Sequence, residues 1–198
     1  RQTARRLARL ATDGELALFI GAGCSVGAGL PEWSDLLRDI ARAAHMRDED
    51  IRSLSTLSTL DQALVLERRL GGPEALQREV VRRLRADRHS LVHGLLAALP
   101  TDGVVTTNYD DLFEEACAGA GVDVNVLPYE ASAPEAGWDD ESRAARRRRW
   151  ILKLHGCVHH PDDIVLTRTQ MNEYADRRQA LTGIVQTLLI TKHMLFVG

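Results

Sequence analysis

The feature that most constrains the fold is an apolar segment, residues 16–20, that runs straight into a glycine-rich loop, residues 21–29. The segment LALFI is short and apolar, as is typical of a buried strand. The loop GAGCSVGAG is made almost entirely of small residues. A strand that ends in small residues before a helix can bring backbone N–H groups close to an anion. Glycines at such a place can also serve only a tight turn, so the loop alone leaves both interpretations open.

The spacing of the glycines excludes the two common nucleotide-binding fingerprints. A dinucleotide loop has the pattern Gly-x-Gly-x-x-Gly, but here Gly21 and Gly23 are followed by Gly27, one residue too late. The segment that follows is helical in pattern and contains no second strand ending in an acidic residue. A mononucleotide P-loop needs Gly-Lys-Ser/Thr, and this loop has no lysine.

Short apolar segments alternate with helical patterns along the rest of the chain, which predicts an α/β fold with a Rossmann-like parallel sheet and helices on both faces. The predicted strands are residues 16–20, 104–106, 122–130, 150–156, 163–167 and 193–198. Residues 131–149 are predicted to form a loop, and residues 168–191 to be helical.

The segment between the first two predicted strands, residues 33–99, is helical in pattern and longer than a simple crossover needs. Within it, residues 59–70, 73–84 and 89–99 are predicted as separate helices, after a first helix that begins at Trp33. We therefore expect an inserted helical subdomain in a single domain spanning residues 1–198. The chain does not begin with Met and stops at LFVG, so it is expected to be a fragment of a longer protein.

Composition excludes several classes of protein. The net charge of −3 gives no overall field for DNA or an anionic membrane. No apolar run approaches the roughly 18 residues of a membrane span. The run Arg146–Arg149 can form a solvated loop or meet a nucleic acid or an acidic partner.

The cysteines and histidines predict neither a disulfide framework nor a metal centre. The three cysteines, Cys24, Cys117 and Cys157, are odd in number and far apart, which is typical of a reduced, cytoplasmic protein. His159 and His160 are adjacent but lack further ligands at metal-binding spacing, so no metal is predicted.

Two polar clusters follow predicted strands, at the carboxyl end where ligands bind in open α/β sheets. The first is TTNYDD, residues 106–111, in which Asn108 offers a donor and an acceptor and Asp110 offers acceptors. These residues can equally be helix caps for the segment that follows. The second is KLHG, residues 153–156, whose His155 titrates near neutral pH and suits acid–base chemistry, although a structural role is equally open.

The three motifs in this order, GAGCSVGAGLPEW, TTNYDD and KLHG, resemble those of the sirtuin superfamily. Sirtuins have a Gly-Ala-Gly-x-Ser loop leading to Gly-Ile-Pro-Asp-Phe, then Thr-Gln-Asn-Ile-Asp, then His-Gly. The resemblance covers residues 16–198. The chain departs from sirtuin deacylases in lacking the four-cysteine zinc module after His-Gly, and in having Glu32-Trp33-Ser34 where they have Asp-Phe-Arg. It is closer to SIR2-like domains of bacterial anti-phage defence proteins that hydrolyse NAD.

The resemblance implies an NAD⁺ glycohydrolase, with NAD as substrate and no metal, that releases nicotinamide and ADP-ribose. Asn108 and Asp110 would lie at the nicotinamide ribose and carboxamide, and His155 would act as the general base. The residues assigned to catalysis are Asn108, His155 and Asp110, and those assigned to binding are Gly21, Ala22, Gly23, Ser25, Pro31, Trp33, Thr106 and Gly198.

Two alternative functions stay open at this point. One is an NAD-dependent protein deacylase or ADP-ribosyltransferase, and the other is a non-catalytic nucleotide-binding module that regulates a partner. The resemblance also implies a homo-oligomer, or an assembly with a sensor domain or partner protein. Contact with nucleic acid is expected only through such a partner, and none with a membrane.

Overall fold

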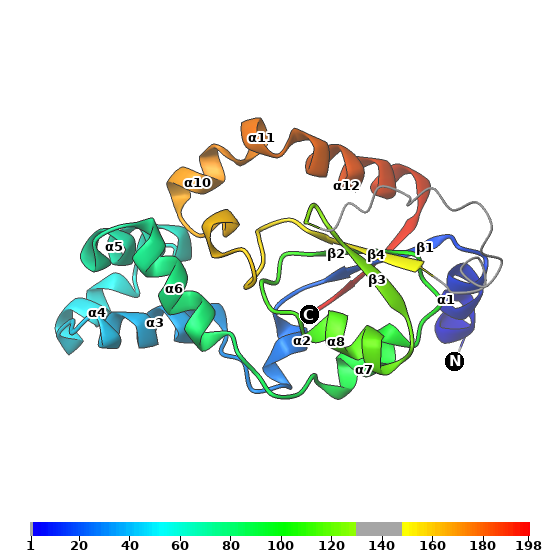
Figure 1. Cartoon of the computed structure of the whole chain (residues 1–198), viewed down its shortest axis with the longest axis horizontal. Coiled ribbons are helices and arrows are strands. Elements are labelled where there is room, and N and C mark those ends of the chain that lie inside the picture. Colours follow the sequence, from blue (N-terminus) through cyan, green and yellow to red (C-terminus); the bar gives the residue numbers. More distant parts are fainter. Residues whose placement is uncertain (1, 130–147) are drawn as a thin grey trace.

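The computed structural model describes residues 2–129 and 148–198, and its centre is a parallel sheet of five strands in the order β3-β4-β2-β1-β5 (Figure 1). The strands are β1 (Leu16–Ile20), β2 (Gly103–Thr106), β3 (Asp123–Leu127), β4 (Arg148–Lys153) and β5 (His193–Val197). The prediction of a parallel α/β sheet is confirmed.

The register of the sheet brings the ends of its central strands to the same level. Ile20 of β1 is paired with Thr106 of β2, and Thr106 is paired with Lys153 of β4. Because these are the last residues of their strands, the three loops that follow leave the sheet side by side. The motifs found in the sequence are therefore neighbours in space.

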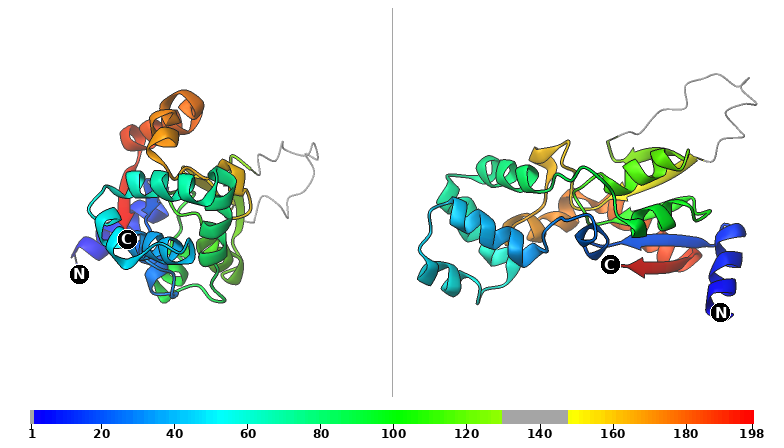
Figure 2. Two further views of the ribbon diagram at one scale, coloured as in Figure 1. Left: turned by 90° about the vertical axis from the view of Figure 1, so that its left-hand side faces the viewer. Right: turned by 90° about the horizontal axis from the view of Figure 1, so that it is seen from below.

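Helices cover both faces of the sheet (Figures 1 and 2). On one face, α1 (Gln2–Thr12), α7 (Leu91–Ala97) and α8 (Leu112–Gly119) pack on the side chains of Leu18 and Val104. On the other face, α12 (Gln179–Thr191) packs on Ala17, Val105 and Leu152. Successive residues of a strand point to opposite faces, so neighbouring residues of β1 and β2 belong to different cores.

A separate group of helices stands at one end of the sheet (Figure 1). These helices are α3 (Trp33–Ala43), α4 (Asp48–Leu54), α5 (Thr59–Leu70) and α6 (Pro73–Arg83). They share an apolar core with Ile164 and Leu166 from the chain after β4. The turn between α5 and α6 needs glycine at its first residue, because Gly71 ends α5 in the left-handed region with φ 93°. We call α3–α6 the helical lobe; α7, the last helix of residues 33–99, lies against the sheet instead.

The strand predicted at residues 163–167 was wrong. Residues 163–167 form no strand: a short 3-10 helix, η1 (Pro161–Asp163), is followed by irregular chain. The apolar side chains of Ile164 and Leu166 are buried against the helical lobe, so their pattern reflected burial without sheet pairing. The prediction that residues 168–191 are helical is confirmed, and the segment is divided into three helices, α10 (Arg168–Asn172), α11 (Tyr174–Arg177) and α12.

The predicted loop 131–149 was also wrong at its end, because β4 already begins at Arg148. Arg149 is 2% exposed, and its guanidinium donates hydrogen bonds to the carbonyls of Ala97, Leu99 and Thr101. It is therefore an internal brace and no part of a basic surface. Trp138, Arg146 and Arg147 lie outside the described residues.

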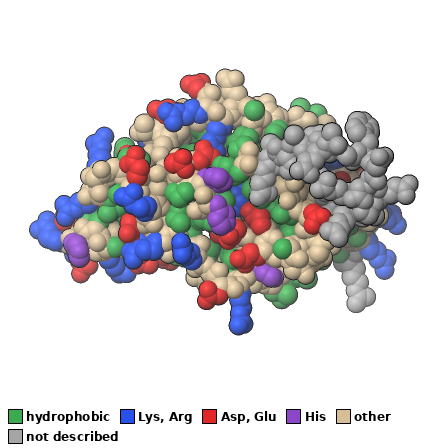
Figure 3. Space-filling view, viewed as in Figure 1, with side chains coloured by type: hydrophobic (Ala, Val, Ile, Leu, Met, Phe, Trp, Pro, Cys, Tyr) green, Lys and Arg blue, Asp and Glu red, His purple; other side chains and the backbone are tan. Residues whose placement is uncertain are grey.

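On the face seen in Figure 3, basic and acidic side chains are interspersed over the helical lobe, without a large patch of one sign. Within residues 2–129 and 148–198, no helix combines the length and the apolar character that crossing a membrane requires.

Candidate active site

A cavity of about 240 Å³ lies where the loops after β1, β2 and β4 meet the helical lobe. It brings together most of the side chains singled out in the sequence. Of the predicted site residues, those that line it are Ala22, Ser25, Pro31, Trp33, Asn108, Asp110 and His155. Gly21, Gly23, Thr106 and Gly198 do not line it.

Asn108 presents an unpartnered oxygen. Its side-chain Nδ2 donates to the carbonyl of Gly21 at 3.1 Å and to Ser25 Oγ at 3.4 Å, which fixes the amide. Its Oδ1 accepts no hydrogen bond from the part of the chain that the structure describes, although the residue is only 8% exposed. A buried polar atom without a partner is costly, so this oxygen is suited to a donor on a ligand or a water.

Asp110 lines the cavity and also accepts a hydrogen bond from the start of α8. Its Oδ2 accepts a hydrogen bond from Ser25 Oγ at 2.9 Å, which links the TTNYDD segment to the glycine-rich loop. Its Oδ1 accepts from the amide of Leu112 at 3.3 Å, in the first turn of α8. The carboxylate of Asp110 therefore joins the glycine-rich loop to the start of α8, whose N-cap residue is Asp111.

Thr106 holds the TTNYDD segment from behind. Its Oγ1 donates to the carbonyl of Ile20 at 2.9 Å and accepts from the amide of Asn108 at 3.0 Å. This pair of bonds ties the ends of β1 and β2 together and directs Asn108 into the cavity.

The glycines of the first loop are required by the close approach of Gly198. A Cβ on Gly21 would lie 2.8 Å from the carbonyl oxygen of Gly198, and a Cβ on Gly23 would lie 3.0 Å from its carbonyl carbon. The amide of Gly21 also donates to Val197 O at 2.8 Å. The first role of Gly21 and Gly23 is thus to let the end of β5 lie against the loop.

His155 follows β4, which lies on the side of β2 opposite to β1, and it lines the cavity. Its ring meets the ring of Tyr174 edge-on, with centroids 5.8 Å apart and planes at 82°. Burial lowers the pKa of His155, and the nearby positive charge of Arg178 lowers it further. Both effects favour the neutral imidazole, which is the form that can accept a proton.

The rest of the cavity wall is apolar and comes mostly from residues that the sequence did not single out. The Trp33 ring lies 6.0 Å from the ring of Tyr109, whose hydroxyl donates to Val165 O at 2.8 Å. The other apolar or small lining residues are Leu30, Leu36, Leu60, Leu84, Thr107, Leu166 and Met171. Tyr109 stands inside the TTNYDD motif and had a local signal; the residues of the helical lobe and of α10 had none.

A buried ion pair beneath the site was also missed. Lys153, the last residue of β4, is fully buried, and its Nζ lies 2.7 Å from Glu114 Oε1 on α8. The same ammonium donates to the carbonyl of Asp110. Burial is the largest single influence and opposes the charge of Lys153, but Glu114, Cys157 and Asp110 together outweigh it and raise the pKa of the lysine. Lys153 is thus a charged link between the strand that carries His155 and the segment that carries Asn108.

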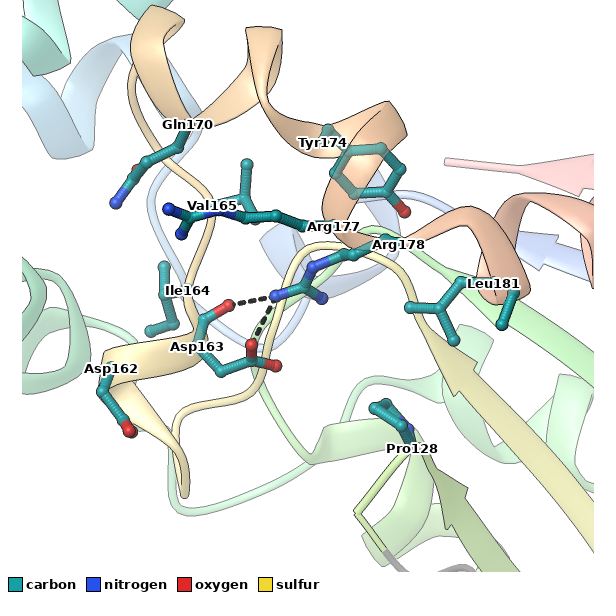
Figure 4. Close-up of a pocket in the computed structure, with 11 residues that line it drawn as sticks. Pro128, Asp162, Asp163, Ile164, Val165, Gln170, Tyr174, Arg177, Arg178 and Leu181 are labelled. Carbon is teal, nitrogen blue, oxygen red and sulfur yellow. Dashed lines mark hydrogen bonds and ion pairs between the residues drawn. The ribbon is translucent and has the colours of Figure 1, made fainter.

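A second cavity, of about 370 Å³, lies beside the first, and the two share Val165 as a wall. It is bounded by η1, α11 and the start of α12, and contains the ion pair between Arg178 and Asp163 (Figure 4). No residue predicted from the sequence lines it. Neither cavity offers a metal centre, since the described ranges 2–129 and 148–198 hold no group of three or more His, Cys, Asp or Glu side chains arranged to bind an ion.

Comparison with known proteins agrees with this geometry. Residues 102–198, which contain the Asn108 and His155 motifs, match the family model described as SIR2-like domain. Over these residues the chain is similar to the SIR2-like domain family.

The chain is also similar to curated bacterial proteins over nearly its whole length. It is 28% identical over 196 residues to the NAD(+) hydrolase ThsA of Acinetobacter baumannii (strain 532279), covering 98% of this chain and 38% of that protein. It is 27% identical over 186 residues to the NAD(+) hydrolase ThsA of Bacillus cereus (strain MSX-D12), covering 92% and 36%. Against the Defense-associated sirtuin 2 of Bacillus subtilis it is 21% identical over 197 residues, covering 94% and 18%. The chain therefore spans well under half the length of these relatives.

Proposed function

We propose that this protein hydrolyses NAD⁺ to nicotinamide and ADP-ribose, with the cavity between Asn108 and His155 as the active site. The observation that carries the proposal is the buried Oδ1 of Asn108, which has no hydrogen-bond partner among the described residues, on an amide that two hydrogen bonds hold in place and on a residue that lines the cavity. The names of the relatives, NAD(+) hydrolase ThsA, support NAD as the substrate.

In the proposed reaction the bond between C1′ of the ribose and the pyridinium nitrogen breaks, and nicotinamide leaves with the bonding electron pair. Positive charge then develops on the ribose. Ser25 holds both the carboxylate of Asp110 and the side-chain amide of Asn108 in place near that centre. The negative charge of Asp110 and the amide dipole of Asn108 would therefore stabilise the positive charge on the ribose without having to reorganise. A water molecule forms the new bond to C1′.

His155 is proposed to take the proton of that water, directly or through a second water. Because burial and Arg178 hold the pKa of His155 below its ordinary value, the ring is neutral at physiological pH and able to accept the proton. The ring would also contact the ribose hydroxyls.

The diphosphate is proposed to lie at the glycine-rich loop. The amides of Gly21, Cys24 and Ser25 already donate to carbonyls of the loop or of β5. The amides of Ala22 and Gly23 are therefore the donors that the loop would offer to the phosphates. Pro31 and Trp33 would form the wall on the nicotinamide side.

We further propose that the intact protein acts in the bacterial cytoplasm as an NAD-depleting effector of anti-phage defence. The name Defense-associated sirtuin 2 of a relative supports this role. Assembly of several copies, or with a sensor domain or partner protein, belongs to the same proposal.

The test is hydrolysis of NAD⁺ by the intact protein, with nicotinamide and ADP-ribose measured with and without phage-derived triggers. We expect His155→Ala and Asn108→Ala to lower the rate by roughly 10²–10⁴-fold, as removal of a positioned acid–base or charge-stabilising group does. The matched controls are His159→Ala and Asn172→Ala, at exposed positions outside the cavity. Full activity in both site variants, with the protein folded, would overturn the assignment.

A further inference from the structure

We infer that Arg178 is a positioning residue for the proposed reaction: it holds the His155–Gly156 turn against the chain that follows it and places a fixed positive charge behind the imidazole. The inference rests on the proposed role of His155 as the base. Arg178 lies between α11 and α12 and belongs to none of the three sequence motifs.

The guanidinium of Arg178 joins two segments on either side of His155. Its Nη1 donates to the carbonyl of Leu154, the residue just before His155, at 2.9 Å. Its Nη2 donates to the carbonyl and to Oδ1 of Asp163 at 2.5 and 2.6 Å (Figure 4). The side chain is only 11% exposed, so these bonds are made largely out of water and their geometry is strongly specified.

The backbone of Asp163 packs closely against the turn formed by His155 and Gly156. Gly156 has φ 103°, and a Cβ at this position would lie 2.7 Å from the carbonyl oxygen of Asp163. Two residues further on, the amide of Val165 donates to the carbonyl of His155 at 2.8 Å. Because Arg178 binds both Leu154 and Asp163, it holds the segment before His155 against the segment that packs on Gly156.

The same guanidinium also reaches His155 through an aromatic ring. Arg178 lies over the ring of Tyr174, 5.8 Å from its centroid, and the ring of His155 meets that tyrosine edge-on. The tyrosine is held between the cation and the imidazole. A cation over a ring and an edge-on ring pair each favour one orientation, so this stack limits the rotation of the His155 ring.

The titratable groups near His155 come from three segments. Asp163, whose carboxylate also accepts from the Tyr129 hydroxyl, comes from η1; the neutral phenol of Tyr174 and the cation Arg178 come from α11 and its end; and Asp110, which lines the same cavity, comes from the loop after β2. Burial is the larger cause of the lowered pKa of His155, and Arg178 is the second. Removing the charge of Arg178 should therefore raise the pKa of His155, so the acidic limb of the rate profile should move to higher pH.

The neighbouring arginine is a matched control. Arg177 also lines the second cavity, but its side chain is 73% exposed and it pairs with Glu173 at 2.9 Å, one turn earlier. It shares the charge and the location of Arg178 and makes none of the contacts to Leu154 or Asp163 described above.

The experiment measures kcat and KM for NAD⁺ against pH in the intact protein, for Arg178→Gln, Arg178→Lys and Arg177→Gln. We expect Arg178→Gln to lower kcat by about 10–10²-fold, as misplacement of a reacting group does, with less than about a threefold change in KM. Its acidic limb should move to higher pH. Arg178→Lys keeps the positive charge but loses the planar guanidinium that binds Leu154 and Asp163 together. We therefore expect kcat to fall while the acidic limb of its pH–rate profile stays near that of the wild type. Arg177→Gln should change neither.

A second measurement is independent of catalysis. The ring signals of His155, assigned by their loss in His155→Ala, are titrated by NMR in the wild type and in the Arg178 variants. A higher His155 pKa in Arg178→Gln than in Arg178→Lys shows that the charge of Arg178 acts on His155, whether or not His155 is the base. Full hydrolysis by His155→Ala would instead overturn the proposed role of His155, so the two failures are distinguishable. Equal His155 pKa values, or equal kcat losses in Arg177→Gln and Arg178→Gln, would overturn the inference. If Arg178→Gln does not fold, kcat of Arg178→Lys is compared with that of the wild type. A fall in kcat supports the inference, and an unchanged kcat overturns it.

Discussion

The two ends of strand β4 both hold a buried cation, but the two cations do different work. Near the start of β4, at the end of the sheet away from the cavity, Arg149 donates to three backbone carbonyls and to Cys117 Sγ. At the end, Lys153 pairs with Glu114 and donates to Asp110 O, directly beneath the candidate site. Ligand sites of parallel sheets gather at the carboxyl ends of strands, so the same kind of interaction is structural at one end and coupled to the site at the other.

The largest effect is expected from Lys153→Met, which leaves the carboxylate of Glu114 buried without its cation. Breaking one partner of a buried pair costs about 3–5 kcal/mol, measured as a fall in the free energy of unfolding by urea denaturation. We also expect kcat for NAD⁺ to fall, because the Asp110 carbonyl loses its donor. Lys153→Met combined with Glu114→Leu should recover much of the stability. A double variant no more stable than Lys153→Met would contradict the pairing.

Arg149→Met should come next, at about 2 kcal/mol. It leaves carbonyls of Ala97, Leu99 and Thr101 without their donor, and unsatisfied buried acceptors cost roughly 1–3 kcal/mol each before water or relaxation offsets part of the loss. The rate per folded molecule should stay unchanged. A loss of kcat as large as that of Lys153→Met would show that the two ends of β4 are not functionally distinct.

Gly103→Ala tests packing at the start of the neighbouring strand. A Cβ on Gly103 would lie 2.4 Å from Cζ2 of Trp150, so the indole must move, at a cost of roughly 1–3 kcal/mol. Because this contact lies at the end of the sheet opposite the cavity, the thermal midpoint should fall without a change in KM. A changed KM would show that displacing the Trp150 indole also shifts His155, which follows the same strand.

The smallest expected effect is a pH dependence of stability between pH 7.5 and 5.5. Burial lowers the pKa of His93 and of His155 in the folded protein. The unfolded chain therefore binds protons that the folded chain does not. The free energy of unfolding is highest above the unfolded pKa of about 6.5, and falls as pH drops below it toward the lowered folded values. Urea midpoints at the two pH values measure the change, and His93→Gln should reduce it. If the fall in the free energy of unfolding between pH 7.5 and 5.5 were unchanged in His93→Gln, this would contradict the burial of a neutral His93.

Much of the site was predictable because its signals are local. Each of the three motifs directly follows an apolar strand, and parallel strands bring their carboxyl ends to one edge of the sheet, so Ser25, Asn108 and His155 were expected to meet. The lining residues Leu60, Leu84 and Met171 had no such signal, because they come from helices whose apolar residues look like ordinary core. Arg178 was hidden for the same reason: its role depends on contacts with Leu154 and Asp163, which lie 24 and 15 residues away.

The sequence by itself determined the alternation of strands and helices, and with it the edge of the sheet where the motifs meet, because hydrophobic periodicity and glycine placement act over a few residues. Only the tertiary structure decided what each polar group does there. It left Asn108 Oδ1 without a partner among the described residues, and it paired the two oxygens of Asp110 with Ser25 and with the amide of Leu112. It also buried Arg149, which belongs to a run that looked solvated. The opening feature shows the same division: Gly21 and Gly23 were visible in the sequence, but the neighbour that requires them, Gly198, lies at the other end of the chain. The cost of a Cβ, a charge or an unpaired oxygen depends on what packs against it, and that neighbour is set by the fold.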